Sequence, residues 1–296
     1  MRPMNKFQDA LKSGKFAVTA GLTPPKGVNL APFRQQVDAL KDRVDAITIS
    51  DNRGAHLAMS SLAASALARQ QGSEVICTLN CRDRNRLALA ADLLGAYALG
   101  IENILPVSGD YLSFGDSPHA MPVFDLDSVQ VLEMARSLEN GTAPGGQDLN
   151  GAPVFFLGGV ANPEAKPLPP QVMKCLKKIR ARADFLITLD VYDLQKLEAF
   201  AAQIDLVEAR LIAGVRLIGP GDVARQASGN PPGNLIPPEI MSEFQSLEES
   251  RAFDLGKRRA VEMIRCIKTR NLAHGVYLRA DLHPEMIPEV IAAAEM

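Results

Sequence analysis

The sequence predicts one α/β domain, a closed (β/α)8 TIM barrel that spans residues 1–296. Eight short apolar runs alternate with segments of helical spacing. The runs lack the polar alternation of half-exposed strands, which is typical of a parallel sheet covered on its outside. Eight such units in 296 residues fit a closed barrel better than an open doubly wound sheet. The open sheet would also call for a G-x-G-x-x-G loop after the first strand, and Gly21 begins no such motif.

The expected strands are short apolar runs, each followed by glycine or a polar residue. Pro24 and Pro25 follow the first run, and proline cannot continue a ladder of hydrogen bonds because it has no N–H. The eight strands are expected at residues 16–22, 44–50, 74–79, 104–107, 154–157, 184–189, 209–215 and 274–278.

The expected helices have apolar side chains every three or four residues. Gly100 ends one of them, since glycine readily takes the left-handed conformation that follows a helix. A loop rich in proline and glycine is expected at 230–238. The helices are expected at residues 5–13, 30–40, 58–71, 86–99, 128–138, 170–182, 192–204, 239–270 with a break, and 284–295.

Composition narrows the class of protein. The net charge is −2 with acids and bases interspersed, so neither nucleic acid nor an anionic membrane is an expected partner. No apolar run reaches the roughly 18 residues that span a bilayer. The four cysteines have no paired metal-type spacing, so we expect reduced thiols, no metal site and a cytoplasmic location.

The segment from Asn103 to Ser128 contains the first candidate site residue. A short apolar run ends at Ser108-Gly109-Asp110, and a long loop of small and polar residues follows. Barrel enzymes place their working groups just past the carboxyl ends of buried strands, so Asp110 is a candidate catalytic residue. The alternative is that Asp110 only caps a turn.

Several loops together resemble the methylenetetrahydrofolate reductase family, in the short form found in anaerobic bacteria. The similarity runs over about residues 15–293. It implies a (β/α)8 barrel that binds a flavin, FAD or FMN, at its carboxyl face and reduces the methylene group on tetrahydrofolate to methyl. The motifs that carry it, in order, are Thr23-Pro24-Pro25-Lys26-Gly27, Cys81-Arg82-Asp83-Arg84-Asn85, Gly100-Ile101-Glu102-Asn103-Ile104-Leu105, Gly109-Asp110, Phe124-Asp125-Leu126-Asp127-Ser128 and Asn162-Pro163-Glu164-Ala165.

The resemblance implies roles for individual residues. Asp110 falls on the family's aspartate, which lies near the flavin and contacts the pterin of the folate. Gly109 allows a close approach of the backbone, and Ser50 falls where a flavin-contacting threonine is usual. Lys178 falls on a helix that meets the flavin phosphates or ribose. Asn162 and Glu164 fall in the loop that lies beside the adenosine part of the cofactor in the family.

Three positions depart from the family pattern. Gly21 stands where the family has its catalytic glutamate, and Leu189 stands where it has a glutamine that binds the substrate. Thr78 replaces a histidine at the cofactor site. Glycine cannot donate a proton, and loss of a positioned general acid costs about 10²–10⁴-fold in rate. Slow reductase turnover is therefore expected.

Three functions remain open at this stage. One is a flavin-dependent reductase whose acid comes from elsewhere, either Asp190 or a water held by Asp110. Another is a flavin-independent methyltransferase that uses tetrahydrofolate or methyltetrahydrofolate on the same barrel. The third is a non-catalytic subunit. The expected partners are a folate and a redox or corrinoid protein, and the sequence leaves a monomer and a homo-oligomer equally open.

Overall fold

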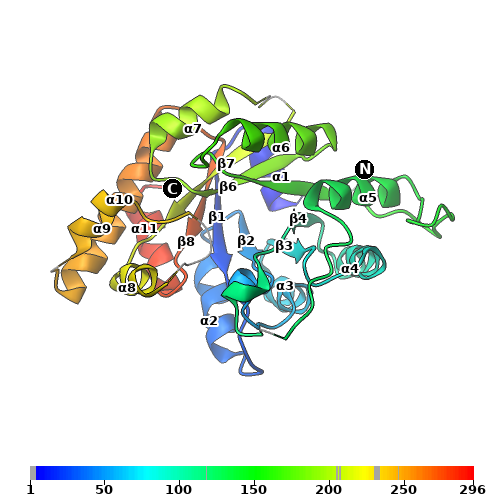
Figure 1. Cartoon of the computed structure of the whole chain (residues 1–296), viewed down its shortest axis with the longest axis horizontal. Coiled ribbons are helices and arrows are strands. Elements are labelled where there is room, and N and C mark those ends of the chain that lie inside the picture. Colours follow the sequence, from blue (N-terminus) through cyan, green and yellow to red (C-terminus); the bar gives the residue numbers. More distant parts are fainter. Residues whose placement is uncertain (1–4, 118, 205, 207, 230–233, 246) are drawn as a thin grey trace.

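The structure is a computed structural model that describes residues 5–117, 119–204, 206, 208–229, 234–245 and 247–296. Its centre is a closed barrel of parallel strands in the order of the sequence, with the last strand paired to the first (Figure 1). The predicted fold class is therefore confirmed. The strands are β1 Ala17–Leu22, β2 Ala46–Ile49, β3 Val75–Asn80, β4 Asn103–Val107, β5 Phe156–Ala161, β6 Phe185–Asp190, β7 Arg210–Arg216 and β8 Gly275–Arg279.

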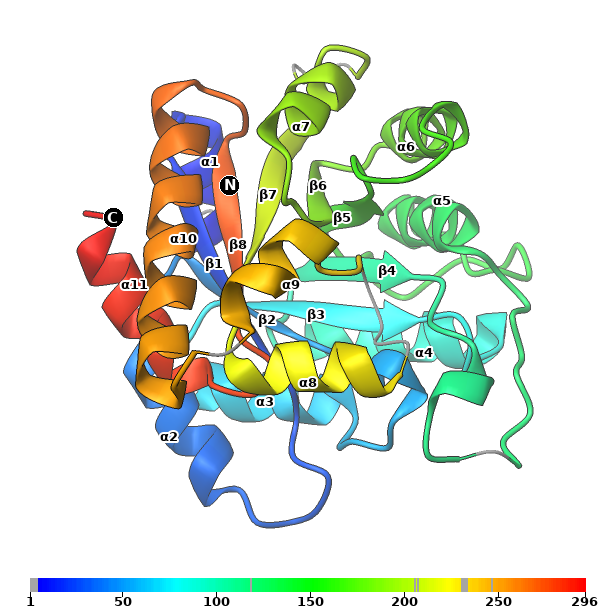
Figure 2. The ribbon, with the colours of Figure 1, turned by 60° about the vertical axis from the view of Figure 1, so that its left-hand side comes forward.

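Helices form an outer layer around these strands, as the turned view in Figure 2 shows. Within the described residues, no helix is both long and apolar enough to span a bilayer. The α-helices are α1 Lys6–Ser13, α2 Ala31–Leu40, α3 Ser61–Gln70, α4 Arg86–Ala98, α5 Ser128–Glu139, α6 Pro169–Arg180, α7 Leu194–Ala201, α8 Pro220–Ser228, α9 Pro238–Phe244, α10 Glu249–Thr269 and α11 Ile287–Ala293. Short 3-10 helices occur at Arg53–Ala55, Leu112–Phe114 and Pro284–Met286.

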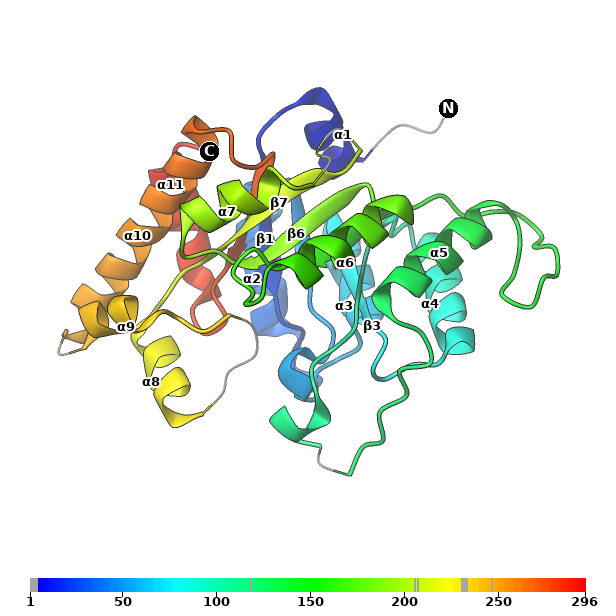
Figure 3. The same ribbon diagram turned by 45° about the horizontal axis from the view of Figure 1, so that its top comes forward.

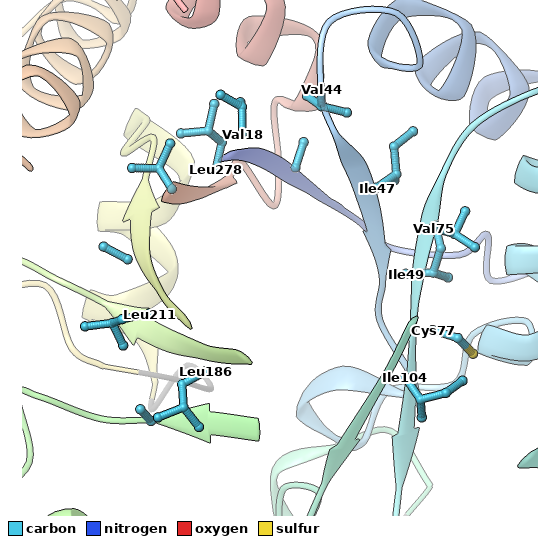
Figure 4. Close-up of a cluster of buried hydrophobic side chains, with 14 of the residues drawn as sticks. Val18, Val44, Ile47, Ile49, Val75, Cys77, Ile104, Leu186, Leu211 and Leu278 are labelled. Atoms are coloured by element: carbon cyan, nitrogen blue, oxygen red, sulfur yellow. The ribbon is translucent and has the colours of Figure 1, made fainter. Parts of the chain in front are cut away.

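Side chains on each strand alternate between two separate hydrophobic environments. Outward side chains such as Val18, Ile47 and Leu278 pack in the large core between strands and helices (Figure 4). Inward positions are more varied, and they include the buried hydroxyls of Thr19 and Thr48. The strands are nevertheless buried on both faces, as the lack of polar alternation predicts, because the inward side chains pack against one another.

Helix α1 closes the end of the barrel at which the strands begin. Its Phe7 is fully buried and lies 5.8 Å from the ring of Phe156 and 5.2 Å from that of Phe185, in edge-to-face contacts. Phe156 and Phe185 themselves stack at 5.2 Å. Figure 3 shows α1 at the top of the barrel and the long loop between β4 and α5 at the bottom. Among the described residues, α1 thus covers one end of the interior, and the cavity opens at the other end, where the strands finish.

Two elements differ from the prediction. Strand β5 was expected to end before Gly158, yet it continues through Gly158 and Gly159 to Ala161. The glycines permit close packing here, because a Cβ at Gly158 would run into the ring of Phe185 and lie 2.9 Å from Leu105. Helix α8 was not predicted at all. The loop expected at 230–238 lies partly outside the described residues, and α9 begins at Pro238.

We predict that Gly158→Ala lowers the free energy of unfolding by about 1–3 kcal/mol, because the added methyl group overpacks the barrel interior. The measurement is the urea midpoint of unfolding. Gly27→Ala is the control, since a Cβ at this exposed glycine meets nothing within 4 Å and should change stability by less than about 0.5 kcal/mol. Equal midpoints for the two variants would contradict the packing argument.

Candidate functional site

A cavity of about 430 Å³ opens where the strands end. This volume lies within the range of about 300–1,000 Å³ that small-molecule sites occupy. Its wall is formed by residues from β2 to β6, the loops that follow them, helix α6 and strand β8. The residues singled out from the sequence that line it are Ser50, Thr78, Gly109, Asp110, Asn162, Lys178 and Leu189.

Asp110 lies in a loop that is held in place from two sides. Its carboxylate Oδ2 accepts a hydrogen bond of 2.8 Å from the backbone N–H of Gly54, in the loop after β2. Its backbone carbonyl accepts one of 3.0 Å from Arg82, in the loop after β3. Gly109 has φ of 90°, and a Cβ there would lie 2.9 Å from the Cβ of Arg82. Asp110 therefore both stabilises a loop contact and faces the cavity.

Arg82 connects three of the loops at the mouth. Its side chain is only 2% exposed, and it donates to the carbonyl of Asn52 (3.2 Å), to that of Asp110 and to the carboxylate of Asp83 (2.6 Å). Burial alone would raise the pKa of Asp83, but hydrogen bonds from Arg82 and two asparagines lower it to about 2. The loops after β2, β3 and β4 are thus fixed together by one buried cation.

Two buried hydroxyl groups in the cavity wall make no hydrogen bond within the described part of the chain. They are Oγ1 of Thr48 on β2 and Oγ of Ser50 just after that strand. A buried polar group without a partner costs about 1–3 kcal/mol. Such groups in the wall of a cavity indicate a polar ligand that would complete their hydrogen bonds.

Lysines of α6 give one part of the cavity wall a positive charge. Lys178 is 3% exposed, and its Nζ donates to the carbonyl of Val160. Burial lowers the pKa of Lys178 to about 8. Lys174, one helical turn earlier, is exposed and also lines the cavity. This end of the cavity suits an anionic group of a ligand.

Two of the residues singled out from the sequence are held in other interactions. The carboxylate of Glu164 accepts hydrogen bonds from the backbone of Tyr192 (2.9 Å) and Asp193 (2.8 Å) and pairs with Lys196 at 2.8 Å. It does not line the cavity. Asp190 is 1% exposed and forms ion pairs with Arg279 and, at 3.8 Å, with Arg216. Its carboxylate belongs to a buried ionic cluster.

Gly21 lies at the end of β1, beside a second and smaller cavity of about 180 Å³. A Cβ built at Gly21 would lie 3.0 Å from two ring carbons of Tyr277 and closer still to its hydroxyl oxygen. Tyr277 and Arg279 of β8 line both cavities. Sequence reasoning missed both residues. The signal that could have found them is the period of two along β8, which places positions 277 and 279 on the same face.

A closed barrel with a ligand-sized cavity at the carboxyl ends of its strands defines a barrel protein built around a small-molecule site. The family is then given by the sequence. The chain belongs to the methylenetetrahydrofolate reductase family, whose model matches residues 6–294. The expected resemblance is thereby confirmed.

Solved structures of low sequence identity share the fold. A protein from Clostridium thermocellum that binds two copies of 5-methyl-5,6,7,8-tetrahydrofolic acid is 15% identical, with a TM-score of 0.63 and 97% of each chain covered. EDTA monooxygenase (EmoA) from Chelativorans sp. BNC1 is 12% identical, with a TM-score of 0.56, 94% of this chain and 92% of that chain. At these identities the likeness establishes the fold alone. No curated protein matches the chain significantly.

We predict that the charge of Lys178 destabilises the protein at neutral pH. Its pKa is about 8 in the folded chain and about 10.4 when unfolded, so the unfolded state binds more protons between these values. Stability should therefore rise with pH through this window, by up to about 3 kcal/mol, and the penalty is fully present below pH 8.

The measurement compares the free energy of unfolding of the parent protein and Lys178→Met from pH 7 to pH 10.5, after bound small molecules are removed. The advantage of the methionine variant should shrink as the pH rises. Lys177→Met, at an exposed neighbouring position, should show no such trend. A constant difference between the parent and Lys178→Met would contradict the prediction.

Proposed function

We propose that this protein binds a tetrahydrofolate derivative in the cavity and uses a flavin to reduce methylenetetrahydrofolate to methyltetrahydrofolate. One observation carries the proposal. In a chain of the methylenetetrahydrofolate reductase family, the cavity at the strand ends combines the Asp110 carboxylate, unpartnered hydroxyls and a lysine-rich end.

Asp110 suits the pterin ring of a folate. A pterin presents N–H donors along one edge, and an ionised carboxylate is a pure acceptor with two oxygens. Because Gly54 and Arg82 hold the Asp110 loop, the carboxylate is oriented before the ligand arrives. The folate-binding barrel from Clostridium thermocellum supports the same ligand class, since its fold and length agree with this chain.

The cavity wall also fits a flavin. The hydroxyls of Thr48 and Ser50 lack partners and could bind polar atoms of its ring system, with Thr78 and Asn162 nearby in the same wall. Lys174 and Lys178 would hold its anionic part. When bound, a reduced flavin supplies a hydride. Glu164 has no part in this proposal because its carboxylate is occupied by the loop after β6.

The residues of this chain then have distinct tasks in the reaction. Asp110 orients the pterin, and the apolar side chains of Leu105, Val107 and Leu189 exclude water from part of the cavity. The position that carries an acid in the family pattern, Gly21, has no side chain. The proton that the folate nitrogen needs must therefore come from another residue.

Methyl transfer without a flavin is the second candidate. It is favoured by the combination of Gly21 and Leu189, which removes an acid and a polar substrate contact. Methyl transfer to or from tetrahydrofolate involves no hydride. A protein of this kind would bind methyltetrahydrofolate and contain no flavin.

We predict that Asp110→Asn weakens the binding of 5-methyltetrahydrofolate by about 10–150-fold, since hydrogen bonds to a charged group contribute about 1.5–3 kcal/mol. The asparagine can still accept the bond from Gly54, so the loop should keep its place. Isothermal titration calorimetry measures the affinity. Asp116→Asn, on the same loop but outside the cavity wall, is the control and should bind as the parent protein does. Unchanged affinity in Asp110→Asn would remove Asp110 from the folate site.

We predict that the purified protein has the absorbance spectrum of a bound flavin and that Lys178→Met loses most of it. Loss of a charge-assisted hydrogen bond to the anionic part of the cofactor should weaken binding by at least about tenfold. Flavin content per chain after gel filtration is the measurement, and Lys177→Met is the control. A colourless protein that still binds 5-methyltetrahydrofolate would overturn the reductase proposal and favour methyl transfer.

A further inference from the structure

We propose that Tyr277 is the proton donor of this barrel and that its phenol acts from the space which a side chain at position 21 would otherwise enter. The inference rests on the proposed reduction of methylenetetrahydrofolate. It identifies the residue that performs the step for which Gly21 has no functional group.

The first argument is geometric. Strand β8 pairs with β1, with Tyr277 opposite Thr19, two residues before Gly21. The Tyr277 ring leans along the inner surface toward β1, so that a Cβ at Gly21 would lie 3.0 Å from two of its carbons. The phenolic oxygen is nearer still to that point. A hydroxyl group therefore stands where the first atoms of a side chain from position 21 would lie.

The second argument is access to the ligand. Tyr277 lines the large cavity together with Asp110, and it also lines the small cavity beside Gly21. Asp110 follows β4, and β4 and β8 lie on opposite sides of the ring of eight strands. A folate whose pterin is held by Asp110 would thus extend across the mouth toward Tyr277.

The third argument is the charge around the phenol. Arg279 on β8, Arg53 in the loop after β2, Asp281 after β8 and Asp190 on β6 face it, and the neighbouring β1 residues Thr19 and Gly21 carry no charge. Burial raises the pKa of Tyr277, so the phenol keeps its proton at neutral pH. The two arginines act in the opposite sense, and they would stabilise the phenolate that forms when the proton leaves.

The proton balance of the step is simple. The phenol of Tyr277 gives its proton to N10 of methylenetetrahydrofolate while the bond between N10 and the methylene carbon breaks, and that bonding pair stays on N10. The lone pair of N5 forms the double bond to the methylene carbon. This carbon then accepts a hydride, for which a reduced flavin is the source, and becomes the methyl group. Water at the mouth returns a proton to the phenolate.

Other acids at the mouth are less suited to this role. Asp190 and Asp281 form ion pairs with Arg279 and Arg53 respectively. The pKa of Asp281 is lowered far below its usual range: burial opposes the shift, and the charges of Arg279, Arg53 and Arg216 outweigh it. Asp51 lines the cavity but accepts a hydrogen bond of 2.7 Å from Arg84. Carboxylates paired with arginines are poor proton donors at neutral pH.

The first test replaces the phenol and keeps the ring. Tyr277→Phe should lower kcat for methylenetetrahydrofolate reduction by about 10²–10⁴-fold. Its flavin content and its Kd for 5-methyltetrahydrofolate should stay within about threefold of the parent, because the ring still fills the same space. Tyr192→Phe is the matched control, since Tyr192 is half-buried at another place and lines neither of these cavities. It should leave kcat unchanged.

The second test moves the acid to β1. Gly21→Glu alone should be poorly active, because its side chain collides with Tyr277. Gly21→Glu combined with Tyr277→Ala has room for the carboxyl group. Its kcat should be at least about tenfold higher than that of Tyr277→Ala alone, because the double variant regains a general acid. The donor must be protonated, and a glutamate has a pKa of about 4.3 against about 10 for tyrosine. The rescued enzyme should therefore lose activity as the pH rises through a much lower range than the parent.

The outcomes separate the two proposals. A parent protein that reduces methylenetetrahydrofolate while Tyr277→Phe has the same kcat would overturn the role of Tyr277 and leave the reductase proposal intact. Loss of kcat together with an equal loss of folate binding would mark Tyr277 as a structural residue. A parent protein that binds folate but reduces none of it would overturn the reductase proposal, and the proton donor with it.

Discussion

The interior of an eight-stranded barrel is only wide enough for side chains to fill it. A large side chain at one inward position therefore leaves less room for the side chains at neighbouring inward positions. Near the strand starts, Phe7, Phe156 and Phe185 occupy that space with stacked and edge-to-face contacts. Near the strand ends the side chains around the cavity include the small and polar Thr48, Ser50 and Thr78 as well as apolar ones. The cavity exists because the aromatic volume is concentrated at one end. The space that a ligand could occupy therefore lies at the other end of the barrel.

The buried charges at the mouth of the barrel are paired with one another. Arg216 is the last residue of β7. It is 5% exposed and pairs with Asp222 at 2.6 Å. Arg279 pairs with Asp190 on the neighbouring side. Breaking a buried ion pair on one side leaves an uncompensated charge and costs about 3–5 kcal/mol. This cluster therefore fixes the mouth between β6 and β8, while Arg82 fixes it between β2 and β4.

Much of the fold followed from local patterns in the sequence, and the exceptions have physical causes. Apolar runs located all eight strands, because a strand buried on both faces needs no partner information to be recognised. Strand β5 was misplaced because Gly158 reads as the end of a strand. Glycine is needed at position 158 because the ring of Phe185 on the next strand packs against it, and this contact exists only in the folded chain. Asp110 was singled out because its motif, Gly109-Asp110, is contiguous, and Lys178 of α6 because the family resemblance implies a basic residue there. Tyr277 was not singled out, because its position beside Gly21 depends on the pairing of the last strand with the first.

That pairing changes what the glycine at position 21 means. Considered from the sequence alone, Gly21 leads to the expectation of a missing acid and of slow reductase turnover. In the barrel, a Cβ at position 21 would lie 3.0 Å from two carbons of the Tyr277 ring, so a side chain there requires that ring to move. A glutamate at position 21 would compete with the phenol of Tyr277 for the same space. In the proposed reaction the two positions act together, so a variant at either one must be interpreted together with the residue at the other.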